Sequence, residues 1–394
     1  MRGTEVRALL CVAAAGLGFV LLGTPPSASA PLGPQGPPGS GVERRVLTRT
    51  ALESGGGRRN SVAIGADGRG LISYDGWRRL QVAHCTDLAC TSATVSTLDT
   101  CDLCEPHTSI AIGADGLGLI SYTGSSVEHP RVVHCSDVAC SSATISTLGE
   151  PDHFAFGISS IAIGADGLGL IGFIEPKGLI PKVAHCSNVK CSTATISPLD
   201  KSVAFRDGMG VAIGADGLGL FSYAAFGTLK VAHCSNLDCS SVTSTVIDDD
   251  DNDNGVGDWS SIAIGTDGLG LVSYLDRANG ALKAAHCSNV KCSAATTATI
   301  DSSGDIGGFT SLAIGADGLG VISYEAPQTR LGPLKVAHCS NVACSSATSH
   351  TLDAAGNLFG TSVAVGVDGF PLVSWYENGS GLQVVHCSNF FCIP

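Results

Sequence analysis

Seven copies of a unit of about 50 residues occupy most of this 394-residue chain. Each unit opens on a run such as Ser-Ile-Ala-Ile-Gly-Ala-Asp-Gly-Leu-Gly-Leu-Ile-Ser-Tyr and closes on a run such as His-Cys-Ser-(Asn or Asp)-x-x-Cys. The aspartate of the Asp-Gly element recurs at Asp67, Asp115, Asp166, Asp216, Asp267, Asp317 and Asp368. A fixed period of this length is typical of repeat architectures, in which each unit packs on its neighbours.

Each unit has the pattern of four short β-strands, and no segment shows a sustained helical period. In the second unit, two runs rich in β-forming residues flank Asp115-Gly116, a dipeptide that favours a tight hairpin. Two further runs follow at 131–135 and 142–148. The sequence therefore predicts an all-β fold, a seven-bladed β-propeller with four antiparallel strands in each blade.

The two ends of the repeat array predict how the ring closes. The seventh unit stops after its third strand, at Cys392-Ile393-Pro394. Residues 47–52 precede the first unit and match the fourth-strand pattern of the other units. We expect this N-terminal strand to complete the last blade, because the ring would otherwise keep an open sheet edge. The propeller is thus predicted over residues 44–394.

The residues before the propeller predict export. Arg2 and Arg7 precede an apolar stretch at 8–22, and Ala28-Ser29-Ala30 fits a cleavage site, so residues 1–30 read as a secretory signal peptide. Residues 31–43 read as a Gly/Pro-rich linker. No later segment has the roughly 18 apolar residues of a membrane span. We expect a secreted protein, extracellular or periplasmic.

Charge and cysteine content narrow the partners and the compartment. Removing residues 1–30 leaves 20 basic residues (22 minus 2) and 34 acidic residues (35 minus 1), a net charge of −14. Such a chain repels phosphate backbones, so nucleic acid is not an expected partner. Sixteen of the 17 cysteines remain, and in an oxidising compartment they favour disulfides.

Fourteen of these cysteines form one Cys-x4-Cys pair in each unit, around the turn between the third and fourth strands. The expected disulfides are Cys85–Cys90, Cys135–Cys140, Cys186–Cys191, Cys234–Cys239, Cys287–Cys292, Cys339–Cys344 and Cys387–Cys392. A histidine precedes each first cysteine and could make a zinc site, but every unit would lack a fourth ligand. We interpret the histidines as hydrogen-bonded core residues and the repeated aspartates as turn residues.

Function is expected where the repeats differ. In an up-and-down blade, the loops after strands two and four open on one face, and here only these loops vary in length and composition. One of them, Cys101-Asp102-Leu103-Cys104, predicts an additional disulfide, with a metal site that uses His107 or a redox pair as alternatives. This variable face is the predicted working surface.

An acidic loop on that face predicts a calcium site. Its pattern, Asp-x-Asn-x-Asn-Gly-x-x-Asp, supplies oxygen ligands at alternate positions, and Gly255 permits the sharp turn. The candidate ligands are Asp250, Asn252, Asn254, the backbone carbonyl of Val256, and Asp258. The pattern looks like the calcium loops of integrin-type repeats and dockerins, and a merely solvated acidic loop is the alternative.

A basic and aromatic cluster in the first unit predicts a ligand site. Guanidinium groups beside an indole can bind a carboxylate or sulfate and stack on a sugar ring. The candidate residues are Arg58, Arg59, Trp77, Arg78 and Arg79. The alternative is a solvated turn.

The repeat motifs resemble those of secreted bacterial β-propeller proteins with Asp-x-x-Gly-x-x-x-Ile-Ser-Tyr and Leu-Lys-x-Ala elements, and the resemblance covers residues 44–394. It implies the propeller fold and little about activity. We expect a non-catalytic binding or surface-scaffold protein that recognises a glycan or a surface protein. The alternative is a polysaccharide lyase or hydrolase, although the sequence shows no Tyr/His/Arg group that converges near the axis, and Asp152-His153 is only a weak catalytic candidate.

Overall fold

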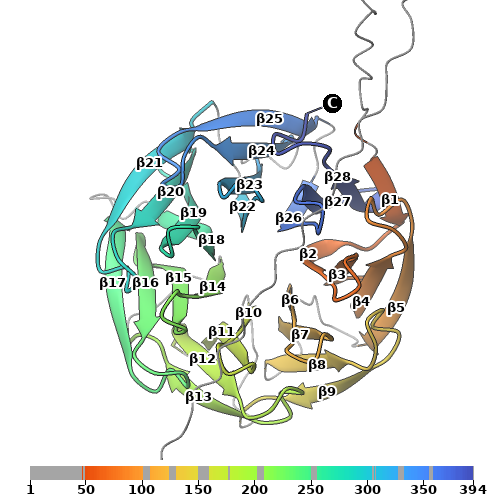
Figure 1. The fold of residues 1–394 in the computed structure, drawn as a ribbon, viewed down its shortest axis with the longest axis horizontal. Coiled ribbons are helices and arrows are strands. Elements are labelled where there is room, and N and C mark those ends of the chain that lie inside the picture. Colours follow the sequence, from red (N-terminus) through yellow and green to blue (C-terminus); the bar gives the residue numbers. More distant parts are fainter. Residues whose placement is uncertain are drawn as a thin grey trace, which may run out of the picture. The chain divides into compact units, whose positions relative to one another are not determined.

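The structure is a computed structural model, and it describes residues 47, 49–100, 107–123, 130–149, 159–175, 178–201, 208–249, 255–303, 306, 308–326, 332–354 and 358–393. These residues form seven four-stranded antiparallel sheets in a ring (Figure 1). The ring belongs to the compact unit Arg44–Pro394, and the predicted all-β propeller is confirmed. None of the described segments forms a helix of membrane-spanning length and hydropathy.

The blades follow one another along the chain, with four consecutive strands in each of the first six. Blade 1 comprises β2 (Arg58–Ile64), β3 (Gly70–Asp75), β4 (Arg79–Cys85) and β5 (Ala93–Thr100). Blade 2 comprises β6 (His107–Ile112), β7 (Gly118–Thr123), β8 (Arg131–Cys135) and β9 (Ala143–Thr147). Blade 3 comprises β10 (Ser159–Ile163), β11 (Gly169–Glu175), β12 (Ile180–Cys186) and β13 (Ala194–Pro198). Blade 4 comprises β14 (Met209–Ile213), β15 (Gly219–Ala225), β16 (Thr228–Cys234) and β17 (Val242–Asp249). Blade 5 comprises β18 (Val256–Ile264), β19 (Gly270–Asp276), β20 (Ala281–Cys287) and β21 (Ala295–Asp301). Blade 6 comprises β22 (Gly308–Ile314), β23 (Gly320–Glu325), β24 (Leu334–Cys339) and β25 (Ala347–Asp353). The first strand of each blade lies at the axis and the fourth at the rim (Figure 1).

Blade 7 joins the two ends of the propeller. Its sheet has the order β1-β28-β27-β26 and comprises β26 (Leu358–Val365), β27 (Pro371–Glu377), β28 (Gly381–His386) and β1 (Arg49–Glu53). Strand β1 pairs antiparallel with β28, with Arg49 opposite Val385. The prediction that an N-terminal strand closes the ring is confirmed, and β1 covers the edge that β28 would otherwise expose.

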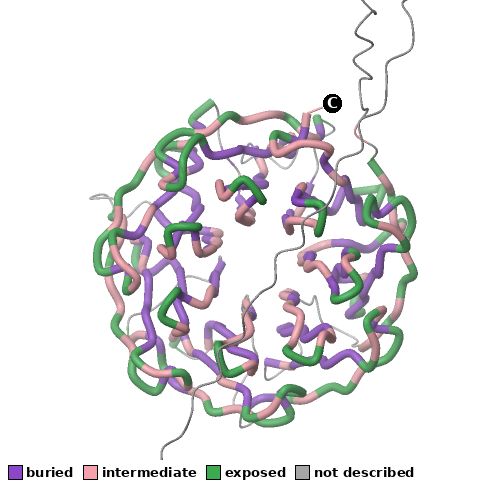
Figure 2. Tube along the Cα trace, viewed as in Figure 1, coloured by how far each residue is buried: buried purple, intermediate pink, exposed green. Residues whose placement is uncertain are grey.

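The hydrophobic core lies between neighbouring blades, since both faces of each sheet are covered. Leu71 and Val82 of blade 1 pack with Ile120, Tyr122 and Val133 of blade 2, and equivalent clusters fill the other seams. Figure 2 shows buried segments along the inner and middle strands, with exposed segments in the turns. Each blade therefore depends on its neighbours for burial, as the repeat pattern predicts.

In six of the seven blades a glycine begins the second strand beside the disulfide, and Pro371 takes this position in blade 7. The seven predicted Cys-x4-Cys disulfides are confirmed. A β-carbon on Gly118 would lie 2.8 Å from Cys135 Sγ and 3.0 Å from Leu71 Cδ2. The second glycine of Asp-Gly-Leu-Gly thus leaves room for the disulfide of its own blade and for a leucine of the preceding one.

The repeated histidines and aspartates bond to each other. His134 Nε2 lies 2.7 Å from Asp115 Oδ2, while Asp115 Oδ1 accepts a hydrogen bond from Leu117 N. Burial alone would raise the pKa of Asp115, but the bonds from His134 and Leu117 N hold that pKa below its ordinary value. The core-histidine prediction is confirmed. The aspartates do more than turn the chain, because they also anchor the third strand.

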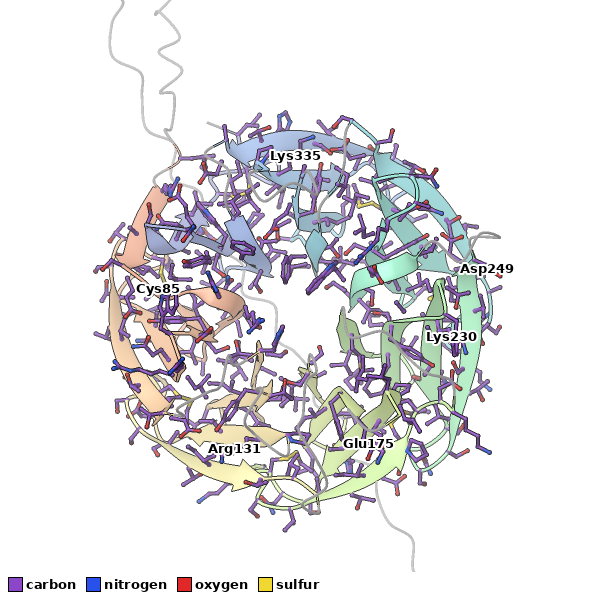
Figure 3. The ribbon with its side chains drawn as sticks, turned by 180° about the vertical axis from the view of Figure 1, so that it is seen from behind. Cys85, Arg131, Glu175, Lys230, Asp249 and Lys335 are labelled. Atoms are coloured by element: carbon purple, nitrogen blue, oxygen red, sulfur yellow. A yellow bond between two sulfur atoms is a disulfide. The ribbon has the colours of Figure 1, made fainter. Side chains whose placement is uncertain are left out.

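Two kinds of polar contact cross the seams. At the axis, Ser61 Oγ accepts a hydrogen bond from Ile110 N of the next blade, which satisfies a backbone group on an open strand edge. Farther out, Asp301 of blade 5 accepts from Tyr324 Oη (2.6 Å) and Lys335 Nζ (2.9 Å) of blade 6. The cations of such clusters, among them Arg131, Lys230 and Lys335, are spaced around the ring (Figure 3). The contacts tie each blade to the next.

Candidate functional site at the propeller axis

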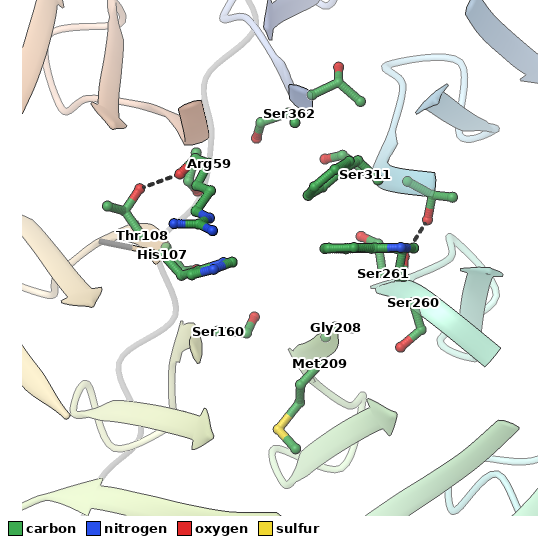
Figure 4. Close-up of a pocket in the computed structure, with 18 of the residues that line it drawn as sticks. Arg59, His107, Thr108, Ser160, Gly208, Met209, Ser260, Ser261, Ser311 and Ser362 are labelled. Carbon is green, nitrogen blue, oxygen red and sulfur yellow. Dashed lines mark hydrogen bonds between the residues drawn. The ribbon is translucent and has the colours of Figure 1, made fainter. Parts of the chain in front are cut away.

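A cavity of about 200 Å³ lies at the axis. Its lining comes from the first residues of the innermost strands and from residues just before them, with contributions from all seven blades. These residues stand at the end where the chain enters each blade, so the cavity opens on the predicted variable face. Figure 4 shows labelled lining residues around the opening, including Arg59, His107, Ser160, Met209 and Ser311.

Most of the described inner strands contain a bulge where they enter the cavity. The pairing of β2 with β3 shifts register between Arg58 and Ser61, and equivalent shifts occur in blades 5, 6 and 7. The residue two positions before the repeated serine then takes a positive φ in blades 1, 4, 5, 6 and 7. Its φ is 52° at Arg59, 125° at Gly208, 54° at Trp259, 43° at Phe309 and 76° at Gly360. Bulges at a rim commonly re-aim a side chain.

The residue types at this position do not follow from the backbone conformation alone. Glycine in blades 4 and 7 fits a positive φ without strain. Arginine, tryptophan and phenylalanine do not, and a non-glycine residue in this conformation costs about 1–3 kcal/mol. Strained backbone of this kind clusters at functional sites. The side chains of Arg59, Trp259 and Phe309 are thus retained where the fold alone favours glycine.

An aromatic pair forms one side of the cavity. The ring centroids of Trp259 and Phe309 lie 3.8 Å apart, with an angle of 39° between the planes. Thr310 Oγ1 donates a hydrogen bond to the Trp259 carbonyl at 2.8 Å, which fixes the bulge. A β-carbon on Gly208 would lie 2.7 Å from Trp259 Cα. Gly208 therefore lets the tryptophan backbone approach blade 4.

Arg59 and His107 lie on the other side, across the opening from Ser260, Ser261 and Ser311 (Figure 4). Thr108 Oγ1 donates to the Arg59 carbonyl at 3.0 Å, so this bulge is held in the same way as that of Trp259. Desolvation, and then the nearby charge of Arg59, hold the pKa of His107 well below its usual value. A neutral imidazole thus lies beside a guanidinium.

Blade 4 departs from the repeat where it meets the cavity. Met209-Gly210 replaces the hydroxyl-bearing pair of other blades, and Gly210 cannot supply the side chain that Ser61 gives its neighbour. In the next blade, Ser260 lines the cavity, and its buried Oγ has no hydrogen-bond partner among the described residues. The equivalent hydroxyls of Thr108 and Thr310 bond to a serine of the preceding blade at 2.9 Å. The corresponding serine of blade 4, Ser222, is likewise without a partner among the described residues.

Acidic groups are scarce in this part of the structure. Among the described lining residues none is aspartate or glutamate. Glu325, at the end of β23, accepts a hydrogen bond from the backbone N of Gly360 at 2.6 Å. Burial raises the pKa of Glu325 well above its ordinary value. The carboxyl bonded to this lining backbone is therefore neutral over a wider pH range than an exposed glutamate.

The residues of the predicted basic cluster lie in two separate places. Arg59 belongs to the cavity, whereas the guanidinium of Arg58 lies 5.2 Å from the centroid of the Trp77 ring and also faces Phe359 and Tyr376. Trp77, Arg78 and Arg79 are exposed at the β3–β4 turn. Arg58 and Arg59 lie in strand β2, and Arg79 begins strand β4.

Three other predicted sites lie wholly or largely outside the described residues. These are the Cys101–Cys104 pair, the Asp152-His153 pair, and the calcium ligands Asp250, Asn252 and Asn254. The remaining calcium candidates, Val256 and Asp258, lie in β18, where Asp258 pairs with Arg277 at 2.6 Å. No cluster of three metal-binding side chains occurs in the described part of the chain.

Sequence reasoning missed the axial residues His107, Trp259 and Phe309. The sequence showed no Tyr/His/Arg group near the axis, and the structure places Arg59 and His107 there, without a tyrosine among the described lining residues. An alignment of the seven units on Ser-Ile-Ala-Ile-Gly contains the signal. The position two residues before the serine holds Arg, His, Ile, Gly, Trp, Phe and Gly, while the residues after it barely change.

The fold defines a seven-bladed β-propeller. No protein-family model matches the sequence, and no curated protein matches it. An ulvan lyase of family PL25, bound to -[GlcA(1-4)Rha3S]-, is similar with a TM-score of 0.58, 8% identity, and coverage of 86% of this chain and 95% of that chain. The GH93 α-L-arabinofuranosidase of Fusarium graminearum, in complex with arabinobiose, is similar with a TM-score of 0.50 and 12% identity. The match covers 71% of this chain and 91% of that chain. The NanB sialidase from Streptococcus pneumoniae matches with a TM-score of 0.49 and 9% identity, over 86% of this chain and 68% of that chain. At these identities, the likeness to the ulvan lyase and to the arabinofuranosidase shows a shared fold alone.

Proposed function

We propose that the protein is a secreted, non-catalytic binding module that recognises an acidic glycan at the axial cavity. The observation that carries this proposal is the bulge position, where Trp259 and Phe309 face Arg59 despite a positive φ at all three residues. Aromatic faces stack on sugar rings, and a guanidinium binds a carboxylate or sulfate. The cavity therefore offers the two contacts that a uronic acid or a sulfated sugar needs.

Two further observations support this choice. Unlike a charged imidazole, the neutral His107 can accept a hydrogen bond from a sugar hydroxyl. The ulvan lyase, which shares the fold, binds a saccharide that contains glucuronic acid. Export is part of the proposal, since seven disulfides suit an oxidising compartment and residues 1–30 read as a signal peptide.

The test is an array of acidic glycans probed with the disulfide-bonded protein and with variants. The wild type should bind uronate-containing or sulfated glycans, while Trp259→Gly and Arg59→Gly should lose that binding. Leu88→Ala, on an exposed disulfide turn, is the matched control and should bind as the wild type does. Unchanged glycan binding by both axial variants would contradict the axial site. If the wild type bound no glycan, a protein partner would become the better candidate.

A second candidate is a lyase that cleaves a uronate glycan by β-elimination, since Arg59 lies beside a neutral His107. Arg59 would neutralise the uronate carboxylate. His107 would take the proton from carbon 5, the bond from carbon 4 to the glycosidic oxygen would break as the C4–C5 double bond forms, and water would protonate the leaving oxygen. The described lining lacks the carboxylate pair that most hydrolases use.

The ultraviolet absorbance of the new double bond distinguishes binding from elimination. A lyase would release absorbing products from an acidic polysaccharide. His107→Gln should abolish their release, whereas affinity should fall by no more than the loss of one hydrogen bond, which the glutamine carbonyl can in part replace. A steady absorbance over prolonged incubation with every glycan that binds would leave the binding module as the function.

Calcium at residues 250–258 is a separate proposal that rests on the sequence pattern. Its last ligand, Asp258, lies directly before Trp259, so bound calcium would brace the strand that carries the aromatic side of the cavity. The ion pair between Asp258 and Arg277 would have to open or share the carboxylate. Calorimetry with calcium should show heat that Asp250→Asn removes, and no heat at millimolar calcium would contradict the site.

A further inference from the structure

Two exposed aromatic side chains stand on hairpins that open on the variable face. Trp77 is 61% exposed in the β3–β4 turn, and Phe226 is 57% exposed in the β15–β16 turn. Each is the first central residue of a two-residue turn, with φ of 56° and 49°. Turns of this kind favour Asn-Gly at their centre. Tryptophan and phenylalanine are therefore strained there and exposed, and neither feature helps folding.

Each of these turns is fixed to the strand that carries an axial side chain. The carbonyl of Gly227, next to Phe226, accepts a hydrogen bond from Val256 N at 3.0 Å, and Val256 begins the strand of Trp259. The Trp77 ring lies over the guanidinium of Arg58, the neighbour of Arg59. Each exposed ring therefore continues one side of the axial cavity outward.

The two hairpins lie on opposite sides of the ring. Figure 1 shows β3 and β4 across the axis from β15 and β16. Both hairpins join a second strand to a third, so both stand at the end of the ring where the cavity opens. A line from Phe226 through Trp259 and Arg59 to Trp77 therefore crosses the mouth of the cavity. A single sugar in the cavity could not contact both exposed rings.

We propose that the ligand is a polysaccharide chain that lies across this face, with one acidic sugar at the axis and further sugars stacked on Phe226 and Trp77. This inference rests on the proposed function and adds the length and path of the ligand. Arg78 lies in the β3–β4 turn beside Trp77, and the guanidinium of Arg58 lies over the Trp77 ring. Both place positive charge near Trp77, which suits a polysaccharide with repeated acidic groups.

The test compares polymer with fragment. Ulvan, alginate and polygalacturonate are each titrated as the polymer and as the disaccharide, with the wild type, Trp77→Ala, Phe226→Gly, Trp259→Gly and the control Leu88→Ala. The outer variants, Trp77→Ala and Phe226→Gly, should each lower the affinity for the polymer about tenfold, as loss of one stacking contact implies. Affinity for the disaccharide should stay within about twofold. Trp259→Gly should weaken both ligands.

The outcomes separate the two proposals. If the outer variants bind the polymer as tightly as the wild type while Trp259→Gly loses the disaccharide, the extended path is overturned and the axial site stands. If the wild type binds neither polymer nor disaccharide from any of the three sources, both proposals fall. Melting temperatures of all variants show whether a loss of binding reflects a loss of fold, and Trp77→Tyr should retain polymer binding.

Discussion

Arg59 occupies a backbone position that suits glycine, and a pair of substitutions can measure this. Glycine in an ordinary strand is about 0.5–1 kcal/mol less stable than alanine. At position 59 the order should reverse, because φ is 52° and alanine would keep the strain. We predict that Arg59→Gly has the higher free energy of unfolding, by about 1 kcal/mol relative to Arg59→Ala.

Chemical denaturation of both variants checks this prediction. Ala111→Gly, in the regular part of β6, is the matched control and should destabilise the protein by about 0.5–1 kcal/mol. A more stable alanine at position 59 would show that the bulge stores no strain.

His107 predicts a dependence of stability on pH. Its pKa in the folded protein lies well below the usual 6.5, so below that pH the unfolded chain takes up a proton that the folded chain does not. Stability should therefore fall as pH decreases from about 6.5, by up to about 1.4 kcal/mol per pH unit. His107→Gln should reduce this slope. Identical slopes between pH 6.5 and 5 in urea denaturation would contradict the assignment.

At the scale of strands, the contact of Asp301 with Tyr324 and Lys335 joins β21 to β23 and β24 across a seam. Asp301→Ala leaves the partly buried ammonium and the buried hydroxyl without their acceptor. The expected loss is about 1–3 kcal/mol in the free energy of unfolding. Asp249→Ala, at an exposed position of β17, should change stability by less than about 0.5 kcal/mol. Equal effects of the two substitutions would show that the seam contact contributes nothing.

The strands were predictable from sequence, whereas of the axial side chains only Arg59 was, for different physical reasons. Strand order, ring closure and cysteine pairing depend on periodicity and local turn chemistry, which repeat every 50 residues or so. The axial site depends on bulges that contain Arg59, Trp259 and Phe309, and a bulge changes the direction of a side chain without a clear sequence pattern. The convergence of residues 59, 107, 259 and 309 also requires the closed ring.

The propeller is a closed ring in which β1 covers the last sheet edge, so its stability should depend on closure. Removing residues 44–52 would expose the edge of β28, and we predict a loss of more than about 4 kcal/mol in stability, a size that single surface changes do not reach. Thermal unfolding measures it, and removal of residues 31–43 is the control that should leave the melting temperature unchanged. An equally stable protein without residues 44–52 would contradict ring closure by β1.

The proposed function requires that the axial cavity bind an acidic glycan. Calorimetric titration of the wild type and Arg59→Gly, with the acidic glycan that binds best on the array, tests this claim most directly. We predict that the variant loses at least about tenfold in affinity, as loss of a charge-assisted contact implies, with its melting temperature retained. Equal affinity of the two proteins would contradict the axial site.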